Sequence, residues 1–370
     1  MAKQFNELLR DVLLRTGNNN NTIRIAIFTA IVLPVVLIAA FAYFSTYQDL
    51  TEFTLLRRQS IADLAATVLE QKLDRLTDIG VSLATRVRFR QLVSEEKWDE
   101  AIAILHEVSK DFPIIERIFL ADPSGTLMAD APALAAVRGK NFANRDWYQG
   151  VSSAWKPYIS GVYQRAAEPR YNVIATAIPI KAEKEKTVGI LVLQVRLDTL
   201  VDWSKSIKVG GAGFVYVVDK EGRLAAHPKV PLQRDIHDYS SVPVVQKVLR
   251  GQNGVEISFN PLEKEERVAA YASVPGSGWG VIATEPTRTA FEKRDEDLKA
   301  LLVRYGLIFL MSCILAYAVL CAVSAREQAE AERQRFENLL NSVIENNPVG
   351  GATIVSSGTQ LARSADRSMV

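Results

Sequence analysis

The stretch "IFLADPSGTLMADAP", residues 118–132, occurs a second time in altered form as "VYVVDKEGRLAAHP", residues 215–228. Each copy has a β-branched and aromatic run, an Asp-x-x-Gly turn, and a second apolar run that opens with Leu. Asp at the first turn position hydrogen-bonds its own backbone and Gly tolerates positive φ, so the pattern predicts a β-hairpin. The turn residues of the first copy, Asp122 and Gly125, recur ninety-seven residues later. The sequence therefore predicts one duplicated module of helices and strands.

Both copies also end alike, with a strand, a connection that contains Pro, and another strand. The first copy does so over residues 173–197 and the second over residues 267–286. Upstream, "IADLAATVLEQKLDRLTDIGVSLATRV", residues 61–87, carries apolar residues at helical spacing with charges between them. This pattern predicts a long amphipathic helix over residues 47–88. We expect an α+β fold with two tandem antiparallel-sheet modules on a long N-terminal helix.

Two long stretches contain no charged residue: "IAIFTAIVLPVVLIAAFAYF", residues 25–44, and "YGLIFLMSCILAYAVLCAV", residues 305–323. At about 1.5 Å per residue, a helix of either length spans the roughly 30 Å hydrocarbon core of a bilayer. We predict that both cross a membrane. The alternatives are a buried core helix and, for the first stretch, a cleaved signal peptide. Both cysteines, Cys313 and Cys321, lie in the second stretch, so no disulfide holds the region between the two.

Basic residues flank the outer ends of both predicted spans, which places both ends in the cytoplasm by the positive-inside rule. These residues are Lys3, Arg10, Arg15 and Arg24 before the first span and Arg326, Arg333 and Arg335 after the second. The predicted organisation is a cytoplasmic tail (1–24), the first span (25–44), an extracytoplasmic region (45–304), the second span (305–323) and a cytoplasmic end (324–370). The net charge of +2 gives no strong field, so we expect a membrane but no nucleic acid as a partner.

Three motifs stand out in the extracytoplasmic region: "NRDWY" (144–148), "PYISGVY" (157–163) and "GAGFVYVVDKEGRLAAHP" (211–228). Together with the order of spans and modules, they resemble the double Cache (dCache) family of extracytoplasmic bacterial sensor domains, over roughly residues 45–300. The resemblance implies two PAS-like modules. A membrane-distal module, about residues 100–200, usually binds a small molecule, and a membrane-proximal module covers about residues 205–287.

Residues 144–164 combine two tryptophans, three tyrosines and an arginine. An arginine grips a carboxylate through two parallel hydrogen bonds, and Trp and Tyr supply apolar walls with a polar tip. On sequence chemistry alone, these aromatic residues fit a protein core equally well. The resemblance favours a ligand pocket in the distal module. The candidate ligand-binding residues are Arg145, Trp147, Tyr148, Tyr158, Tyr163, Lys140, Arg165 and Gln194.

The resemblance also bears on the class of ligand. In the amino-acid-binding branch of the family, a tyrosine stands five residues before the arginine, and a later aspartate grips the ammonium group of the ligand. Here these positions carry Lys140 and Gln194. Gln194 is neutral and cannot balance a buried ammonium group as a carboxylate does. We therefore expect an organic acid or another anion, held by Arg145 with help from Lys140 or Arg165, rather than an α-amino acid.

The sequence shows no motif for catalysis or metal binding. Its three histidines, His106, His227 and His237, include no pair at metal-ligand spacing. "VGGAGF", residues 209–214, lacks the ending of a phosphate-binding loop, and no G-x-S-x-G motif occurs. We expect no cofactor, no metal and no catalytic residue in this chain.

Near the C-terminal end, "RFENLLNSVIENNPVG", residues 335–350, is similar to the opening helix and turn of an intracellular PAS domain. Too few residues follow for a whole domain, so we expect a truncated PAS-like start. The likeness suggests the sensory part of a histidine kinase or of a cyclic-nucleotide signalling protein whose output domain is missing from this chain.

These observations predict a bacterial transmembrane sensor, expected as a homodimer in the cell inner membrane with its sensor domain in the periplasm or outside. It would bind a small, carboxylate-bearing solute and pass the signal to a cytoplasmic output, as two-component systems do. The alternative is a membrane-anchored solute-binding or envelope interaction protein without signalling.

Overall fold

The computed structural model describes residues 20–106, 108–182, 185–232 and 235–345. The chain divides into two compact units. One unit combines the two ends of the chain, up to Thr46 and from Asp297 onward, and the other covers Tyr47–Glu296. Most of the predicted tail, and the end of the PAS-like segment, lie outside the described residues.

Two long helices contain the predicted spans. Helix α2 runs over Asn20–Ala84 and helix α10 over Glu292–Glu345. Both are long and apolar enough to cross a membrane by length and composition, with mean hydropathies of 2.8 and 2.5 over their most apolar windows. These windows are only 6% and 11% buried, which argues against two buried core helices.

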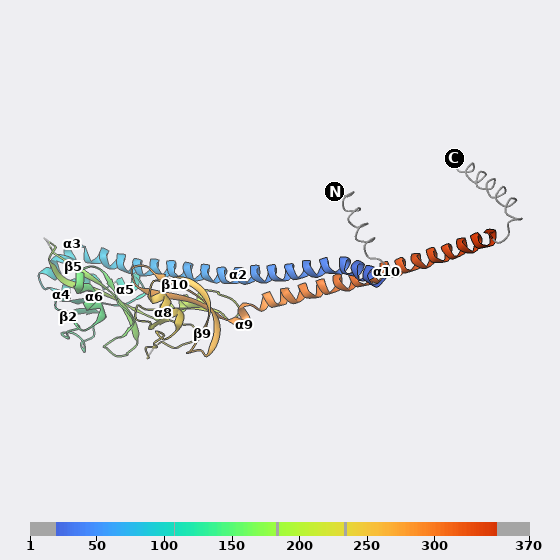
Figure 1. Cartoon of the computed structure of the whole chain (residues 1–370). Helices are drawn as coiled ribbons and strands as arrows, with labels where there is room; N and C mark the ends of the chain where they lie inside the picture. Colours follow the sequence, from blue (N-terminus) through green and yellow to red (C-terminus); the bar gives the residue numbers. More distant parts are fainter. Residues whose placement is uncertain (1–19, 107, 183–184, 233–234, 346–370) are drawn as a thin grey trace. The chain divides into compact units, whose positions relative to one another are not determined.

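The distal module places four short helices and a six-stranded antiparallel sheet after α2. Its elements are α3 (Val87–Ser94), α4 (Trp98–Ile104), α5 (Val108–Asp111), β1 (Ile115–Ala121), β2 (Leu127–Ala131), α6 (Asp146–Ala154), β3 (Tyr158–Ile159), β4 (Tyr163–Gln164), β5 (Asn172–Lys181) and β6 (Thr187–Arg196). The strand order is β2-β1-β6-β5-β3, and β4 also pairs with β5. Figure 1 shows the module beside the C-terminal part of α2.

The proximal module repeats this arrangement with a five-stranded antiparallel sheet. Its elements are α7 (Asp198–Ser206), β7 (Phe214–Val218), β8 (Leu224–Ala226), α8 (Pro243–Leu249), β9 (Gly254–Asn260), β10 (Glu265–Val274), β11 (Trp279–Pro286) and α9 (Thr287–Ala290). The strand order is β8-β7-β11-β10-β9, so each strand has a counterpart in the distal sheet. The predicted α+β fold, with two antiparallel modules on a long N-terminal helix and two candidate spans, is confirmed.

The two Asp-x-x-Gly turns form the predicted hairpins by the same local bonds. Oδ1 of Asp122 accepts hydrogen bonds from the backbone amides of Ser124 (2.9 Å) and Thr126 (2.8 Å). In the second copy, Oδ1 of Asp219 accepts two equivalent bonds from the turn that follows it. The turn glycines, Gly125 and Gly222, both have φ of +86°, a conformation that other residues adopt at a cost.

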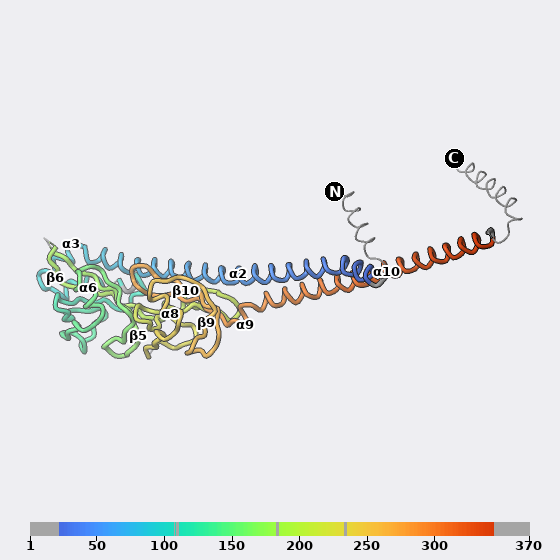
Figure 2. Tube along the Cα trace, in the orientation of Figure 1, coloured from blue at the N-terminus to red at the C-terminus, as the bar shows by residue number. Residues whose placement is uncertain are grey.

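One face of α2 forms the base of both modules. The buried stripe consists of Ala62, Ala65, Ala66, Leu69, Leu73, Leu76 and Leu83. This stripe belongs to a single hydrophobic core that includes residues of both sheets. Figure 2 shows both modules lying along this part of α2. The helix ends at Ala84, a few residues before the predicted end, because Arg86 is extended and a new helix starts at Val87.

A buried ion pair ties α2 to the proximal sheet. The guanidinium group of Arg58 binds the carboxylate of Glu285 on β11, and the two side chains are only 8% and 2% exposed. Arg58 also donates from Nη1 to the carbonyl of Thr54, 2.8 Å away. Because both charges are removed from water, each depends on the other.

We expect Glu285→Ala to destabilise the sensor region by about 3–5 kcal/mol, because it leaves Arg58 buried without its carboxylate. Urea unfolding followed by near-ultraviolet circular dichroism measures the loss. Glu185→Ala, which removes an exposed partner of Lys181, is the matched control and should shift the unfolding midpoint little. Equal effects of the two substitutions would contradict the assigned role of the buried pair.

Candidate functional site

The distal sheet has a second face, opposite α2, and this face carries the candidate site. Successive residues of a strand point to opposite faces, so Ile118 and Leu120 join the α2 core while Phe119 joins a separate cluster with Trp147 and Val151 of α6. Within this cluster lies a cavity of about 30 Å³. It is lined by Arg117, Phe119, Leu127, Val137, Phe142, Arg145, Trp147, Tyr163, Arg165, Ala166 and Gln194.

The start of α6 positions two of the lining residues. Arg145 is the extended residue immediately before the helix, and Asp146 follows in the first turn, where a carboxylate is favoured by the helix dipole. The next residue, Trp147, is 2% exposed and meets the Phe119 ring edge-on, with ring centroids 5.5 Å apart. The local chain therefore sends Arg145 and Trp147 to the same cavity.

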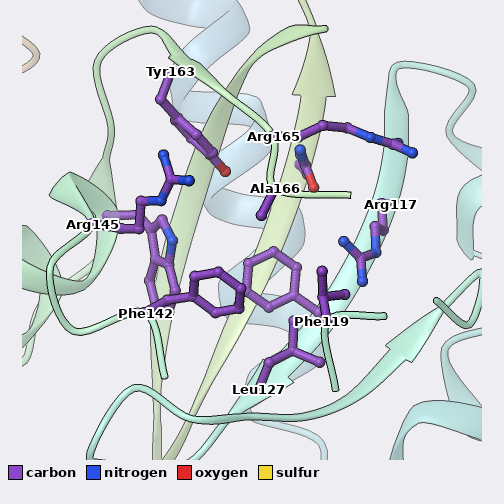
Figure 3. Close-up of a pocket in the computed structure, with 11 residues that line it drawn as sticks. Arg117, Phe119, Leu127, Phe142, Arg145, Tyr163, Arg165 and Ala166 are labelled. Carbon is purple, nitrogen blue, oxygen red and sulfur yellow. The ribbon is translucent and has the colours of Figure 1, made fainter. Parts of the chain in front are cut away.

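The Arg145 guanidinium group forms no ion pair with any carboxylate of the described residues. Its Nη1 donates a long hydrogen bond to the carbonyl of Gln164 (3.4 Å), and its Cζ lies 5.5 Å from the centre of the Tyr163 ring. In Figure 3, Arg145 and Arg117 approach the cavity from opposite sides, with the rings of Phe119 and Phe142 between them. Arg145 thus keeps donors available for an anion.

The other two lining arginines already have carboxylate partners. Arg117 is 4% exposed and binds Asp130, which also accepts a bond of 2.7 Å from Nε of Arg138. Arg165 lies 2.6 Å from Glu116 and donates to two backbone carbonyls of the following loop. Their charges are therefore largely balanced before any solute arrives.

Burial and nearby charges shift the pKa values of two residues around the cavity. Burial alone would raise the pKa of Asp130, but the bonds from Arg138 and Arg117 outweigh it and hold that pKa below its ordinary value of 3.8. Burial raises the pKa of the Tyr163 hydroxyl, although the nearby charge of Arg145 opposes the rise. Tyr163 is thus an uncharged phenol at neutral pH, able to donate or accept a hydrogen bond.

Five of the eight candidate residues line the cavity: Arg145, Trp147, Tyr163, Arg165 and Gln194. Gln194 is 2% exposed and lies near the C-terminal end of β6, opposite Arg117 of β1 in the sheet register. The structure thus gathers side chains that are far apart in the sequence, from Arg145 to Gln194. Their roles as ligand contacts remain predictions.

The other three candidates, Lys140, Tyr148 and Tyr158, are not lining residues of this cavity. Lys140 is exposed. The Tyr148 hydroxyl donates to the carbonyl of Pro123 (2.9 Å), and its ring packs on the first hairpin turn. The Tyr158 hydroxyl donates to Oδ1 of Asp146 (2.9 Å), which fixes the ring beside α6.

The sequence reasoning missed six lining residues: Arg117, Phe119, Leu127, Val137, Phe142 and Ala166. One signal was present, since Arg117 lies two residues before Phe119 in β1 and therefore on the same strand face. Phe142 occupies a loop without regular structure, and no spacing in the sequence connects it with the strands.

Among the described residues, no three side chains of His, Cys, Asp or Glu gather to hold a metal ion. His227 is buried in the proximal module, where its Nδ1 accepts bonds of 3.1 Å from the backbone amides of Lys229 and Val230. These bonds give His227 a structural role in the turn after β8.

The chain belongs to the Cache domain family: the sequence model of this family, in its dCache_1 form, matches residues 46–293. The chain thus contains a dCache sensor domain, and two candidate membrane spans flank this domain. The resemblance seen in the sequence is confirmed.

Two solved structures share the fold. The periplasmic sensory domain of the Campylobacter jejuni chemoreceptor Tlp1 is 17% identical and matches with a TM-score of 0.52, covering 65% of this chain and 98% of that chain. The ligand-binding domain of the Pseudomonas aeruginosa PAO1 amino acid chemoreceptor PctB, in complex with L-Gln, is 18% identical with a TM-score of 0.51, covering 66% and 98%. At these identities the likeness shows the fold alone.

Methyl-accepting chemotaxis protein McpA of Bacillus subtilis is 22% identical over 227 residues, which cover 58% of this chain and 32% of McpA. The chain therefore matches about a third of the length of this curated relative.

The lowered pKa of Asp130 predicts a pH-dependent contribution to stability. A depressed pKa stabilises the fold fully above the unfolded value, near 3.8, and the contribution is lost as the pH falls through the folded value. We expect urea unfolding to show a large gap between wild type and Asp130→Asn at pH 7 that narrows below about pH 4. Asp99→Asn, which removes an exposed partner of the same Arg138, is the control. A gap that stays constant with pH would contradict the prediction.

Proposed function

We propose that the distal module binds a small solute through its carboxylate group, which Arg145 holds. The observation that carries this proposal is the state of Arg145, which lines the cavity without an acidic partner among the described residues. A guanidinium group presents a planar fork of donors that matches a carboxylate. Trp147, Phe119 and Phe142 supply apolar walls for the rest of the solute.

The charges of the lining favour an organic acid over an amino acid. The eleven lining residues include three arginines and no Asp or Glu, so none of them offers a carboxylate to an ammonium group. Gln194, at the position that the family resemblance assigns to the ammonium contact, is neutral. An amino acid remains the competing ligand, since PctB was solved in complex with L-Gln.

The size of the cavity indicates that binding requires a rearrangement. About 30 Å³ holds water or one small polar group, whereas a solute of several heavy atoms needs more room. The side chains that can yield are those held by weak contacts, Arg145 and Tyr163, rather than the paired Arg117 and Arg165. Binding is therefore coupled to a shift of the segments that carry these two residues.

Several further features belong to the same proposal. The protein lies in the cell inner membrane, with its sensor domain in the periplasm or outside the cell. It acts as a homodimer and passes the binding signal to a cytoplasmic output. The similarity to a methyl-accepting chemotaxis protein supports a signalling role. The candidate outputs are those of a chemoreceptor, a histidine kinase and a cyclic-nucleotide signalling protein. A membrane-anchored solute-binding or envelope interaction protein is the alternative.

Arg145→Ala should abolish binding and leave the fold intact. Removing one partner of a largely desolvated charge pair costs about 2–5 kcal/mol, or roughly thirtyfold to several thousandfold in affinity. Arg145→Lys should also weaken binding, because an ammonium group lacks the planar fork. Calorimetric titration of the full chain in nanodiscs with a panel of mono- and dicarboxylates and the twenty amino acids measures both effects.

The matched control for Arg145 is Arg250→Ala, which removes an exposed arginine of the proximal module and should leave affinity unchanged. If Arg145→Ala binds a carboxylate as tightly as wild type, the proposed contact is wrong. If it unfolds the domain, Arg145 is structural.

Gln194→Glu keeps the shape of the side chain and adds a negative charge beside the cavity. We expect it to weaken carboxylate binding at least about tenfold through like-charge repulsion, and to improve binding of amino acids, whose ammonium group gains a partner. The same titrations measure both changes. Gln149→Glu, on the exposed side of α6, controls for the added charge. Unchanged selectivity in Gln194→Glu would place the solute away from β6.

A further inference from the structure

The hairpin turn of the proximal module contacts the distal module, whereas the turn of the distal module does not return this contact. Asp219 is fully buried, and its Oδ2 accepts hydrogen bonds from the backbone amide of Val162 and from Nε of Arg223, both at 2.8 Å. Val162 immediately precedes the lining residue Tyr163. The equivalent Asp122 bonds only within its own turn among the described residues.

The next residue of the same turn, Lys220, contacts the part of the distal module around the start of α6. Nζ of Lys220 lies 2.6 Å from Oδ1 of Asp146 and 4.6 Å from the centre of the Tyr158 ring, and it also bonds the Tyr158 hydroxyl. Asp146 stands between Arg145 and Trp147 in the sequence, and its Oδ2 accepts the amide of Gly161 at 2.7 Å. Asp146 thus joins the start of α6 to the segment before β4.

Gly161 shows how closely the two modules approach here. A Cβ atom at this position would lie 2.4 Å from Nη2 of Arg223 and 2.7 Å from Oδ2 of Asp219. Both distances are shorter than nonbonded contacts allow, so a side chain at this position would displace the ends of the Arg223 and Asp219 side chains from their present places.

We propose that the turn of residues 219–223 positions the two segments of the distal pocket that carry Arg145 and Tyr163. We also propose that this turn transmits the binding of a solute to the proximal module. It holds Arg145 through Asp146 and Tyr163 through Val162. The identity of the solute rests on the proposed function, but the positioning role does not. These two residues face each other across a small cavity, and we expect entry of a solute to separate them and to displace Asp146 or Val162 relative to the turn.

Linkage makes this contact reciprocal. If a bound solute changes the equilibrium constant of the contact between the modules by some factor, then formation of this contact changes the affinity for the solute by the same factor. The Lys220–Asp146 pair is partly exposed, at 28% and 29%, so water screens it and it contributes little to global stability. Its loss should therefore appear in the pocket and not in the unfolding transition. A merely structural pair would show neither a local effect at the pocket nor a change in affinity.

The first test needs no solute. Hydrogen–deuterium exchange of the full chain in nanodiscs should show the Gly161 and Val162 amides and the first turn of α6 exchanging about threefold to tenfold faster in Lys220→Met than in wild type. Lys247→Met is the matched control, because it breaks a similarly exposed pair with Glu256 inside the proximal module. Lys220→Arg, which keeps the charge, should restore slow exchange.

The second test uses acetate, the smallest organic carboxylate that Arg145 could grip. In wild type, acetate should change exchange at residues 219–223, and Lys220→Met should abolish this response and alter the acetate dissociation constant at least about threefold. Gly161→Ala should do the same without removing a charge. Asp219→Asn should also affect the pocket, because Oδ2 of Asp219 accepts the amide of Val162.

The outcomes separate the two proposals. Exchange and acetate affinity in Lys220→Met that match wild type and Lys247→Met would overturn the positioning role of the turn. If acetate fails to protect the pocket of wild type while Lys220→Met still accelerates exchange, the carboxylate assignment loses support and the positioning role stands. If acetate binds but residues 219–223 do not respond, the turn does not carry occupancy.

Discussion

Burial of one face of α2 beneath two sheets is the constraint on which the other features depend. The helix offers a stripe of small and branched apolar residues, and both sheets must turn one face toward it. Because strand residues alternate between faces, fixing Ile118 and Leu120 against α2 sends Arg117 and Phe119 to the opposite side. The face of the distal sheet that carries the cavity is thus determined by a helix that has no residue among those lining it.

Around the cavity, the pairing of charges distinguishes three residues of the same type. Arg117 and Arg165 are almost fully buried, where an unpaired charge is costly, and each has a carboxylate. Arg145 is partly exposed, so water can stabilise its charge without a carboxylate partner. The arrangement keeps one guanidinium group accessible while the surrounding ones hold the loops that shape the site.

The sequence predicted those features that depend on local chemistry. The Asp-x-x-Gly hairpins follow from turn geometry, and the long helix follows from its apolar period, so both could be read without a structure. It could not reveal which arginine is unpaired, because the partner of Arg117 is fixed by the pairing of β1 with β2. The aromatic motif likewise showed which residues are near one another but not their direction, so Tyr148 and Tyr158 support the loops instead of lining the cavity.

The two copies of the module have diverged at corresponding positions. Arg145 and Val242 are separated by the repeat distance, and each immediately precedes a helix. The backbone amide of each donates a hydrogen bond to the backbone carbonyl of the aromatic residue three positions earlier. Val242 cannot hold an anion, and nearby the rings of Tyr216, His227 and Tyr239 pack together. The proximal copy thus lacks the cation of the distal pocket, while its hairpin turn has contacts with the distal module. These two differences fit a division of roles in which the distal copy binds a solute and the proximal copy responds to its binding.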